Sequence, residues 1–453
     1  MKLQQAFGVV PGDVVAFVGA GGKTSTLVAL AHELAELGWR VLATTTTRLG
    51  ADQAGLFPAA LSDFDAPNRL SDALEAQRIV LVHGGIYDGK IHAPHEGWFD
   101  TLPDRVDSDV LLIEADGARG LPWKLPRAHE PVIPDSTTLT IPVVSLSVLG
   151  QPFDEDHVMN AGALAEAYGF PEGAPVKSAW VAQALRDPDF GLKGIPDRSR
   201  IVAWLNGATR EGYMRGRARH IANLALVEPR IQAVALGSAR ASDPAYEVQR
   251  RVAAVVLAAG LSSRMGQSKV LLPWGRGTVL EQILRQLIQA RVRDLVVVTG
   301  HRAEDVAQVA ANYEATAAFN PAYAQGEMLS SVQAGLRALP QHISAALIVL
   351  GDQPRIQPAV VSALLAAYAE GKGDIIAPSF QHRRGHPILI DRRFWPELLA
   401  LVDGAPRDVI NQHADRVYYV NVTTDSVLRD MDTPADYEDE RRRAGLAGEE
   451  GKE

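Results

Sequence analysis

The residues best suited to chemistry lie in the segment 252–269, VAAVVLAAGLSSRMGQSK. Its first half is an apolar run, which is typical of a buried parallel strand. The loop that follows contains Gly260 and Gly266, and glycines let backbone amides come close to phosphate oxygens. It also contains Arg264 and Lys269, whose charges would neutralise a triphosphate. We interpret the segment as a phosphate-binding loop rather than as a Gly/Ser surface loop, although no Gly-Lys-Ser or Gly-Lys-Thr closes it as in a Walker loop.

Carboxylates occur at two further places in the same half of the chain. Asp352 follows the apolar run Leu347–Leu350, so it would lie at the carboxyl end of a buried strand, where open α/β sheets bind ligands. Asp430 and Asp432 are two residues apart, which places both side chains on one face if the segment is extended. We expect Asp352 and Asp432 to hold Mg²⁺ over a triphosphate. The alternative for each acid is a turn or a helix cap.

Several segments between residues 251 and 440 carry a resemblance to a known family. They are LAAGLSSRMGQSK, VTGH (298–301), NPAYAQGEMLSSVQAG (320–335), GDQP (351–354), RGHPILI (384–390) and MDTPADY (431–437). In this order they resemble the nucleotidyltransferases that mature molybdenum cofactor, and most closely the cytidylyltransferases. The guanylyltransferase relatives usually read A-G-G in place of Ala258-Ala259-Gly260 and lack the T-G-H found here at 299–301. The resemblance implies transfer of CMP from CTP to molybdopterin, which gives the cytosine dinucleotide form and pyrophosphate.

The residues fit such a transfer. The nucleophile would be a phosphate that is already anionic, so positioning and charge neutralisation should supply most of the catalysis. We assign Arg264 and Lys269 to the phosphates and Asp352, as the third catalytic group, to the metal. The remaining expected nucleotide-binding residues are Leu257, Ala258, Ala259, Gly260, Ser263, Gly266, Thr299 and Gly300, with Asn320, Ser330, Ser331 and His386 placed near the nucleotide or the pterin by the resemblance. For His386 a structural role is an equal alternative, and DGAPR (403–407) departs from the GDxGAR-like stretch of the relatives.

A second glycine-rich loop occurs near the start of the chain. Gly-Ala-Gly-Gly-Lys-Thr (19–24) follows the apolar run VVAFV, but a Walker loop would need glycine at Phe17. The shorter spacing resembles the ATP loop of the Mur ligases. We expect Lys23 on phosphate oxygens and the hydroxyl of Thr24 or Ser25 toward Mg²⁺, with the amides at a helix N-terminus. The expected binding residues are Gly19, Gly21, Gly22, Lys23, Thr24 and Ser25; the alternative is a simple strand–helix turn.

Two acids support this site. Glu114 and Asp116 follow the apolar run Val110–Ile113, where carboxylates suit Mg²⁺ or a metal-bound water. The alternative is an Asp-Gly turn that ends the strand. His83, His129 and Glu130 are candidates for metal or substrate groups, but we interpret them as solvated loop residues.

The first half of the chain carries its own resemblance. VGAGGKTS, ATTTTR, EADGARGLPWKLPRAHEPVIP (114–134) and VLGQPFDED (148–156) resemble the selenium-dependent hydroxylase accessory proteins over about residues 5–240. The resemblance implies a pathway more than a reaction. The run IVAWLN (201–206) continues as Gly207-Ala208-Thr209, without the acid that would pair guanine, so we do not predict GTP specificity.

The order of apolar and polar segments predicts an α/β fold. Strands are expected at 14–18, 40–43, 79–82, 110–113, 139–144, 201–205 and 231–236, and in a second series at 252–258, 295–299, 346–350, 375–377, 386–390 and 417–420. Helical patterns between them, such as Thr26–Leu37, predict two tandem doubly wound, mostly parallel sheets. The first would be a P-loop-like domain (1–245) and the second a Rossmann-like nucleotidyltransferase domain (251–440). We place the domain boundary in the polar stretch 237–251, and expect a charged tail (441–453) that frays after about Glu438.

Composition limits the remaining classes. The chain has 453 residues, of which 47% are hydrophobic, and its net charge of −9 argues against a nucleic-acid binder. No cysteine is present, which excludes disulfides and thiolate metal sites. No apolar run approaches a membrane span, and the first residues lack the apolar stretch of a signal peptide. We therefore expect a cytoplasmic protein without membrane or nucleic-acid partners.

Both halves indicate a bifunctional maturation protein for molybdenum hydroxylases. Its substrates would be CTP and molybdopterin, with Mg²⁺; ATP is a candidate ligand of the N-terminal loop, and a molybdenum hydroxylase apo-enzyme is a candidate partner. The alternatives are a guanylyl or sugar nucleotidyltransferase, a non-catalytic cofactor carrier, and a protein whose N-terminal half only docks partners.

Overall fold

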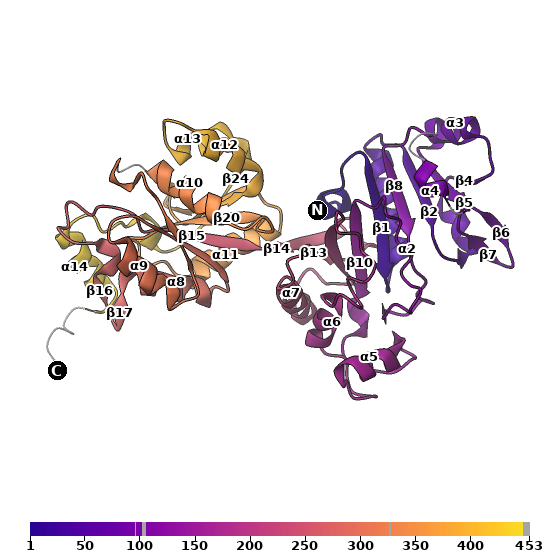
Figure 1. Cartoon of the computed structure of the whole chain (residues 1–453), viewed down its shortest axis with the longest axis horizontal. Coiled ribbons are helices and arrows are strands. Elements are labelled where there is room, and N and C mark those ends of the chain that lie inside the picture. Colours follow the sequence, from indigo (N-terminus) through magenta and orange to yellow (C-terminus); the bar gives the residue numbers. More distant parts are fainter. Residues whose placement is uncertain (96, 102–105, 326–327, 447–453) are drawn as a thin grey trace. The chain divides into compact units, whose positions relative to one another are not determined.

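The chain forms two compact units. The computed structural model describes residues 1–95, 97–101, 106–325 and 328–446. Unit 1 comprises residues 1–249 and unit 2 residues 250–453, and each contains its own large sheet (Figure 1). Among the described residues, no helix has the length and apolar character needed to cross a membrane.

Unit 1 is built on a nine-stranded sheet in the order β14-β13-β12-β10-β1-β8-β2-β5-β4. Neighbouring strands from β13 to β4 are parallel throughout. The strands are β1 (Asp13–Gly19), β2 (Val41–Thr45), β4 (Ala59–Ser62), β5 (Ile79–His83), β8 (Val110–Glu114), β10 (Leu139–Ser145), β12 (Arg200–Asn206), β13 (Ile231–Gly237) and β14 (Ala245–Arg250). Small sheets are formed by β3 (Leu49–Gly50), β6 (Gly85–Tyr87) and β7 (Lys90–His92), and by β9 (Trp123–Lys124) and β11 (Val158–Met159).

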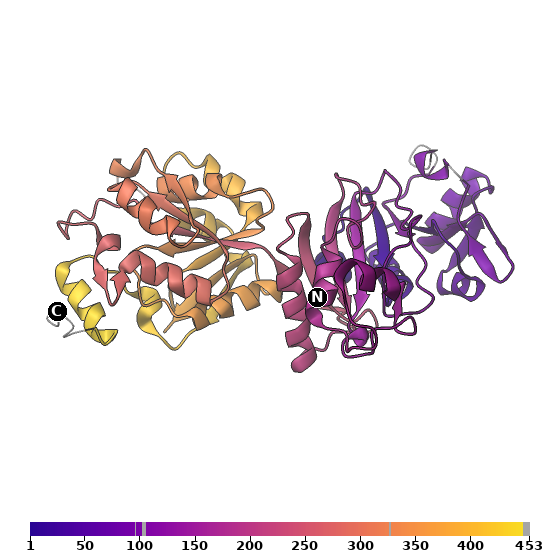
Figure 2. The same cartoon turned by 60° about the horizontal axis from the view of Figure 1, so that its bottom comes forward.

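Helices cover both faces of this sheet (Figure 2). They are α1 (Leu3–Phe7), α2 (Lys23–Glu36), α3 (Pro67–Gln77), α4 (Trp98–Thr101), α5 (Ala161–Tyr168), α6 (Ser178–Leu185) and α7 (Tyr213–Ala225), with 3-10 turns η1 (Ala51–Leu56) and η2 (Leu146–Val148). Along β1, Val15 and Phe17 pack in the cluster that includes α1 and α2, whereas Ala16 and Val18 pack in the cluster that includes α3. Because both faces are covered, the strands are continuously apolar, and this is why they were recognisable in the sequence.

Unit 2 is built on a sheet in the order β19-β18-β15-β20-β23-β21-β22, with β24 paired to β21. The strands are β15 (Val252–Leu257), β18 (Asp294–Thr299), β19 (Thr316–Phe319), β20 (Ala345–Leu350), β21 (Ile375–Phe380), β22 (Arg383–Arg384), β23 (Ile388–Asp391) and β24 (Val417–Asn421), and β16 (Pro273–Trp274) with β17 (Gly277–Thr278) forms a separate hairpin. Strand β15 is parallel to both of its neighbours, whereas β23 is antiparallel to β20 and β21. The α/β class with parallel-dominated sheets is confirmed for the chain.

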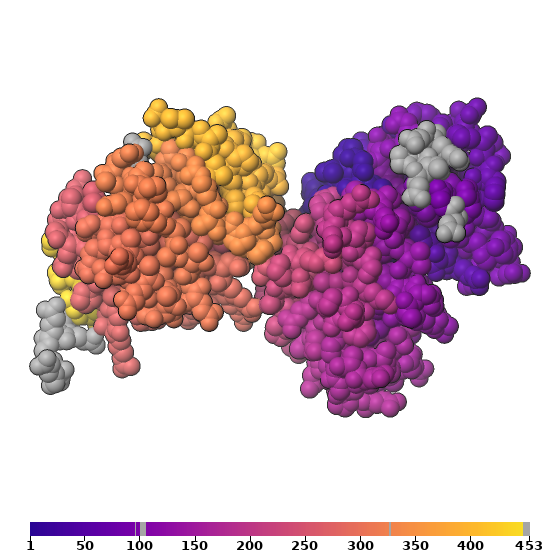
Figure 3. All heavy atoms as spheres, in the orientation of Figure 1, coloured from indigo at the N-terminus to yellow at the C-terminus, as the bar shows by residue number. Residues whose placement is uncertain are grey.

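The helices of unit 2 also lie on both faces of its sheet. They are α8 (Val279–Gln289), α9 (Ala303–Ala311), α10 (Met328–Ala338), α11 (Pro358–Ala369), α12 (Trp395–Ala400), α13 (Pro406–Gln412) and α14 (Pro434–Arg443), with 3-10 turns η3 (Lys269–Leu271), η4 (Tyr323–Gln325), η5 (Arg392–Phe394), η6 (Ala414–Arg416) and η7 (Asp425–Leu428). The space-filling view shows residues of the last part of the chain, in yellow, along one margin of the unit (Figure 3).

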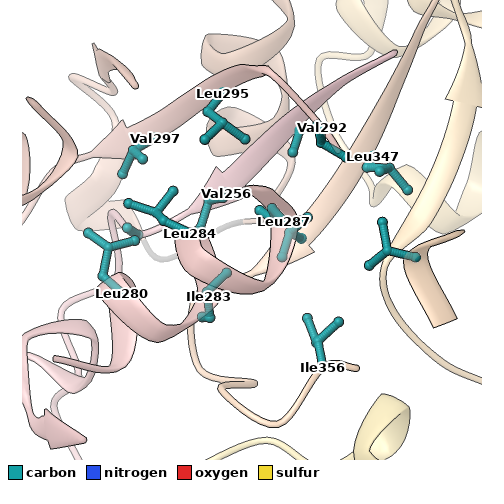
Figure 4. Close-up of a cluster of buried hydrophobic side chains, with 14 of the residues drawn as sticks. Val256, Leu280, Ile283, Leu284, Leu287, Val292, Leu295, Val297, Leu347 and Ile356 are labelled. Atoms are coloured by element: carbon teal, nitrogen blue, oxygen red, sulfur yellow. The ribbon is translucent and has the colours of Figure 1, made fainter. Parts of the chain in front are cut away.

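One core cluster of unit 2 shows how the sheet and helix α8 are joined. Thr278 caps α8 and forms a capping box with Glu281, which fixes where the helix begins. The helix then directs its apolar face at the sheet, where its leucines lie beside Val256 and Leu347 (Figure 4). This packing holds β15 in place, and the glycine loop starts where β15 ends.

The polar segment 237–251, where the domain boundary is expected, contains both strand β14 and the division between the two units at Gln249 and Arg250. Its Glu247 is fully buried and lies 3.1 Å from Arg215 and 2.6 Å from Arg219 of helix α7, so this strand contains a buried, paired charge. The fraying expected after Glu438 fails for the described residues, because α14 continues to Arg443. Residues 447–453 of the tail lie outside the part that the structure describes.

Candidate functional site

The carboxyl ends of β15 and β20 open into a cavity of about 530 Å³ in unit 2. The expected site residues that line it are Leu257, Ala258, Ala259, Gly260, Ser263, Arg264, Lys269, Ser331, Asp352 and Asp432. The sequence did not indicate the remaining lining residues, which are Leu261, Ser262, Val270, Tyr323, Met328, Leu350 and Gly351. The glycine loop and the acids, which are far apart in the sequence, thus meet at one cavity.

Glycine at position 351 brings the two strand ends together. The Gly351 amide donates a hydrogen bond to the Leu257 carbonyl at 3.1 Å, and a Cβ atom on Gly351 would collide with that same oxygen. In the loop itself, Gly266 has φ +69°, a left-handed conformation that suits glycine. The Ser262 hydroxyl accepts a hydrogen bond from the Lys269 amide at 3.1 Å, so the loop folds back and presents Lys269 to the cavity.

Lys269 links the two expected metal ligands. Its Nζ lies 2.7 Å from Asp432 Oδ1 and 3.4 Å from Asp352 Oδ2. Arg264 Nη1 lies 3.3 Å from the other oxygen of Asp432. Burial raises the pKa of Asp352 and the Asp430 charge raises it further, while the Lys269 ammonium opposes both. Two carboxylates and two cations therefore face one another in the lining of this cavity.

Asp430 does not share this position. Its Oδ1 accepts a hydrogen bond from Gln353 Nε2 at 2.7 Å, which ties the segment to the end of β20. The cap of helix α14 is Thr433, whose hydroxyl accepts from the Asp436 amide. The capping alternative therefore does not apply to Asp432, which is left to face Lys269.

A second set of expected residues lies outside the cavity lining. Asn320 is buried and donates hydrogen bonds from Nδ2 to Ser330 Oγ and Ser331 Oγ, both at 3.0 Å, so it supports Ser331 from behind. Thr299 is buried, and a Cβ atom on Gly300 would lie 2.7 Å from the Ala259 carbonyl oxygen. Gly300 thus lets the end of β18 pack against the glycine loop. These residues shape the cavity through their neighbours.

His386 also lies outside the cavity lining. It precedes β23 and is not part of the strand expected at 386–390. Its amide donates to the Val427 carbonyl at 2.9 Å, and burial lowers the pKa of its imidazole to about 4. The contacts of His386 favour the structural alternative.

In unit 1, the loop between β1 and α2 forms a second candidate site. Lys23 is 3% exposed, and its Nζ donates to the Gly19 carbonyl at 2.7 Å and lies 3.1 Å from Asp116 Oδ1. The Thr24 hydroxyl donates to Glu114 Oε2 at 2.6 Å, whereas Ser25 is exposed. The expected lysine, hydroxyl and both acids are therefore together.

The glycines of this loop are required by close packing. Gly19, Gly21 and Gly22 all have positive φ, and a Cβ atom on Gly22 would collide with the Asn206 amide group. Asn206 Nδ2 in turn donates to the Gly21 carbonyl at 2.8 Å. Asn206, the last residue of β12, where the guanine-pairing motif is absent, therefore holds the loop.

Two functional candidates in unit 1 were missed or misread in the sequence. Lys124 Nζ donates to Glu130 Oε2 at 2.8 Å and to the Gly117 carbonyl at 2.6 Å, and it lies 3.3 Å from Asp116 Oδ2. Glu130 is thus no solvated loop residue; burial alone would raise its pKa, but bonds from Lys124 and the Arg127 amide bring the pKa below its usual range. His83 is also buried, with 9% of its surface exposed. The sequence did contain a signal for this pairing. Lys124 lies between Trp123 and an apolar leucine, which indicates a buried lysine, and a buried lysine requires an acid as its partner.

The pKa of Glu114 is set by its burial and by its polar neighbours. Burial raises the pKa of this carboxyl, against the opposing effects of the Lys23 ammonium and the Thr24 hydroxyl. Among the described residues, no three His, Asp or Glu side chains cluster as a metal-ligand set. Each unit instead brings two of the expected carboxylates to one lysine, Asp352 and Asp432 to Lys269 and Glu114 and Asp116 to Lys23.

The sheet, the glycine loop and the cavity of unit 2 define a nucleotidyltransferase-type α/β domain, and comparisons with known proteins agree. Residues 254–417 match the MobA-like NTP transferase domain, and residues 15–162 match the YqeC protein family. The chain belongs to both families, the YqeC family through its N-terminal part and the MobA-like NTP transferases through its C-terminal part. The expected two-part resemblance is confirmed.

Three relatives illustrate the match. The molybdenum cofactor cytidylyltransferase of Escherichia coli (strain K12) is 31% identical over 188 residues, which are 40% of this chain and 92% of that protein. The YqeC protein of the same organism is 33% identical over 199 residues, 43% of this chain and 75% of that protein. The molybdenum cofactor guanylyltransferase of Xanthomonas euvesicatoria pv. vesicatoria (strain 85-10) is 53% identical over 57 residues, 13% of this chain and 30% of that protein.

Proposed function

We propose that unit 2 transfers CMP from CTP to molybdopterin in molybdenum cofactor maturation. The observation that carries the proposal is the placement of Lys269 between Asp352 and Asp432, under a glycine loop, at a cavity of about 530 Å³. The similarity to a cytidylyltransferase over nearly all of that protein supports the cofactor, and Ala258-Ala259-Gly260 with Thr299-Gly300-His301 supports CTP.

The transfer needs charge and alignment more than proton transfer. A phosphate oxygen of molybdopterin would attack the α-phosphorus of CTP; the new P–O bond forms as the bond to the β-phosphate oxygen breaks and pyrophosphate leaves. Lys269 and Arg264 would neutralise the oxygens of the transferring and leaving phosphates, and loop amides would orient them. Asp352 and Asp432 would hold Mg²⁺, which supplies positive charge to the phosphates when bound. Since the nucleophile is anionic, no side chain has to act as a base.

A nucleotide panel tests this proposal. Pyrophosphate release is measured with molybdopterin, Mg²⁺ and CTP, GTP, ATP or UTP in turn, on wild type, Asp352→Asn and the control Asp415→Asn, whose acid is exposed and outside the cavity. We expect release with CTP that requires molybdopterin, is lost in Asp352→Asn and persists in the control. Release with GTP alone would identify a guanylyltransferase, an alternative that the 53% identical segment favours. Nucleotide binding without pyrophosphate release would favour the non-catalytic cofactor carrier.

We further propose that unit 1 binds ATP with Mg²⁺. The supporting observation is the convergence of Lys23, Thr24, Glu114 and Asp116 at the ends of the adjacent parallel strands β1 and β8. Residues 1–245 and 251–440 would then be two functional domains, with a molybdenum hydroxylase apo-enzyme as the recipient of the product. The test is equilibrium ATP binding to the full chain, which Lys23→Met should abolish; unchanged binding would contradict it.

A further inference from the structure

The Asp116 carboxylate of unit 1 lies between two lysines. Lys23 Nζ is 3.1 Å from Oδ1, and Lys124 Nζ is 3.3 Å from Oδ2. All three side chains are at most 3% exposed. In addition, Oδ2 accepts a hydrogen bond from the Gly19 amide at 3.0 Å, so Asp116 also touches the first residue of the glycine loop.

The two lysines have different supports. Lys124 is held by two further acceptors, the Glu130 carboxylate at 2.8 Å and the Gly117 carbonyl at 2.6 Å. Lys23 begins helix α2 at the glycine loop, and its other contacts are the Gly19 carbonyl at 2.7 Å and Glu114 at 3.9 Å. Lys124 is thus fixed behind the acid, whereas Lys23 belongs to the loop where phosphates would bind.

One oxygen of Asp116 is left without a hydrogen bond. Among the described residues, Oδ1 is buried and accepts none, although the Lys23 ammonium is close. Buried acceptors without a hydrogen bond are uncommon, and here the Lys23 ammonium, 3.1 Å away, supplies the charge that balances Oδ1. A cavity of about 40 Å³ lies beside Gly19, Asp116 and Lys124. Once Lys23 moves to phosphate, this oxygen, the cavity and the Glu114 carboxylate would be available to a cation or its water.

We propose that Lys124 is the permanent counter-ion of Asp116 and a positioning residue of the unit 1 nucleotide site. It allows Lys23 to leave Asp116 for phosphate oxygens while the acid stays ionised and directed at the glycine loop, where it can accept Mg²⁺. A buried acid that loses its last counter-ion is strongly destabilised, so without Lys124 the Lys23–Asp116 pair would hold Lys23 away from phosphate. The inference rests on the proposed binding of ATP by unit 1.

A double-mutant experiment tests the exchange. The dissociation constant of a fluorescent ATP analogue is measured with Mg²⁺ and in EDTA on wild type, Lys124→Met, Lys124→Arg and the double variant Asp116→Asn/Lys124→Met. Lys193→Met is the matched control, because Lys193 donates to the carbonyls of Arg127 and Ala128 and so tethers the same segment without touching Asp116. Thermal melting reports whether unit 1 of each full-length variant is folded, and CTP turnover reports that unit 2 is intact.

The expected pattern differs from that of a structural lysine. Lys124→Met should weaken binding about tenfold or more in both conditions, while Lys124→Arg and the control should stay within about threefold of wild type. In EDTA the double variant should bind better than Lys124→Met, because the uncompensated Asp116 carboxylate then no longer retains Lys23. Equal binding by wild type and Lys124→Met, or a double variant no better than the single one, would overturn the inference. If Lys124→Met does not fold, loss of binding by folded Lys124→Arg would overturn it. Wild type that binds no nucleotide would remove the proposed unit 1 function itself.

Discussion

Replacement of Lys269 by methionine should separate turnover from metal binding in unit 2. Methionine keeps most of the side-chain volume and removes the charge that lies 2.7 Å from Asp432 and 3.4 Å from Asp352. In the complex with CTP, the same ammonium would face the transferring phosphates. In the protein without nucleotide, it would compete with a cation for the two carboxylates of the proposed metal site. The substitution should therefore lower turnover in one assay and raise metal affinity in another.

The expected magnitudes follow from exposure and charge. Loss of one positioned group that stabilises developing charge should lower turnover about 10²–10³-fold. Asp432 is 51% exposed and Asp352 24%, so solvent screens both pairs, and the folding free energy should fall by only about 1 kcal/mol. Removal of the competing ammonium should raise the affinity of the nucleotide-free protein for Mn²⁺ by roughly tenfold.

Three measurements on the same samples check these values. They are pyrophosphate release with CTP and molybdopterin, free Mn²⁺ by electron paramagnetic resonance, and thermal melting, with Lys372→Met as a control for loss of a lysine outside the cavity. Turnover that stays within about threefold of wild type would refute the role of Lys269. Weaker Mn²⁺ binding would refute the competition between ammonium and cation.

Three further predictions concern other positions. Burial depresses the pKa of His386 from 6.5 to about 4. The stability that the neutral imidazole contributes is therefore present above pH 6.5 and is lost as the pH falls toward 4. His386→Gln should show less acid destabilisation than wild type in melting curves recorded over that pH range. Gly351→Ala would force the new methyl against the Leu257 carbonyl, so it should lower the unfolding free energy by about 1–3 kcal/mol and reduce CTP turnover, and an unchanged melting temperature would contradict the close approach. Lys23→Met should abolish ATP binding yet leave CTP turnover within about twofold of wild type; a parallel loss of both would show that the two sites are not independent.

The framework strands could be predicted from the sequence because they are buried on both faces. The run expected at 14–18 is observed as Asp13–Gly19, and that expected at 295–299 as Asp294–Thr299. Strand β14 could not be predicted in this way. It contains Glu247 and Arg250, and Glu247 is stable inside the protein only because arginines of a helix far away in the sequence reach it. Local composition cannot show such a partner.

For the candidate sites too, one part could be predicted from the sequence and another part could not. Glycines, lysines and acids that follow apolar runs were predicted to meet, since the ends of parallel strands lie at one edge of a sheet. The sequence could not separate residues that line the cavity from those that support it, as Asn320 supports Ser331. It also did not reveal the pairing of Lys124 with Glu130 and Asp116, because this depends on how the segment after β8 folds back over the sheet.

Transfer of the α-phosphate label from CTP to molybdopterin tests the central claim most directly. Full-length protein is incubated with Mg²⁺, molybdopterin and CTP labelled at the α- or the γ-phosphate, and the dinucleotide is identified by its mass. We predict that the α-label appears in the dinucleotide, the γ-label appears in pyrophosphate, and neither transfer occurs with Asp352→Asn. Bound CTP that remains intact, or label transferred only from GTP, would contradict cytidylyl transfer by this site.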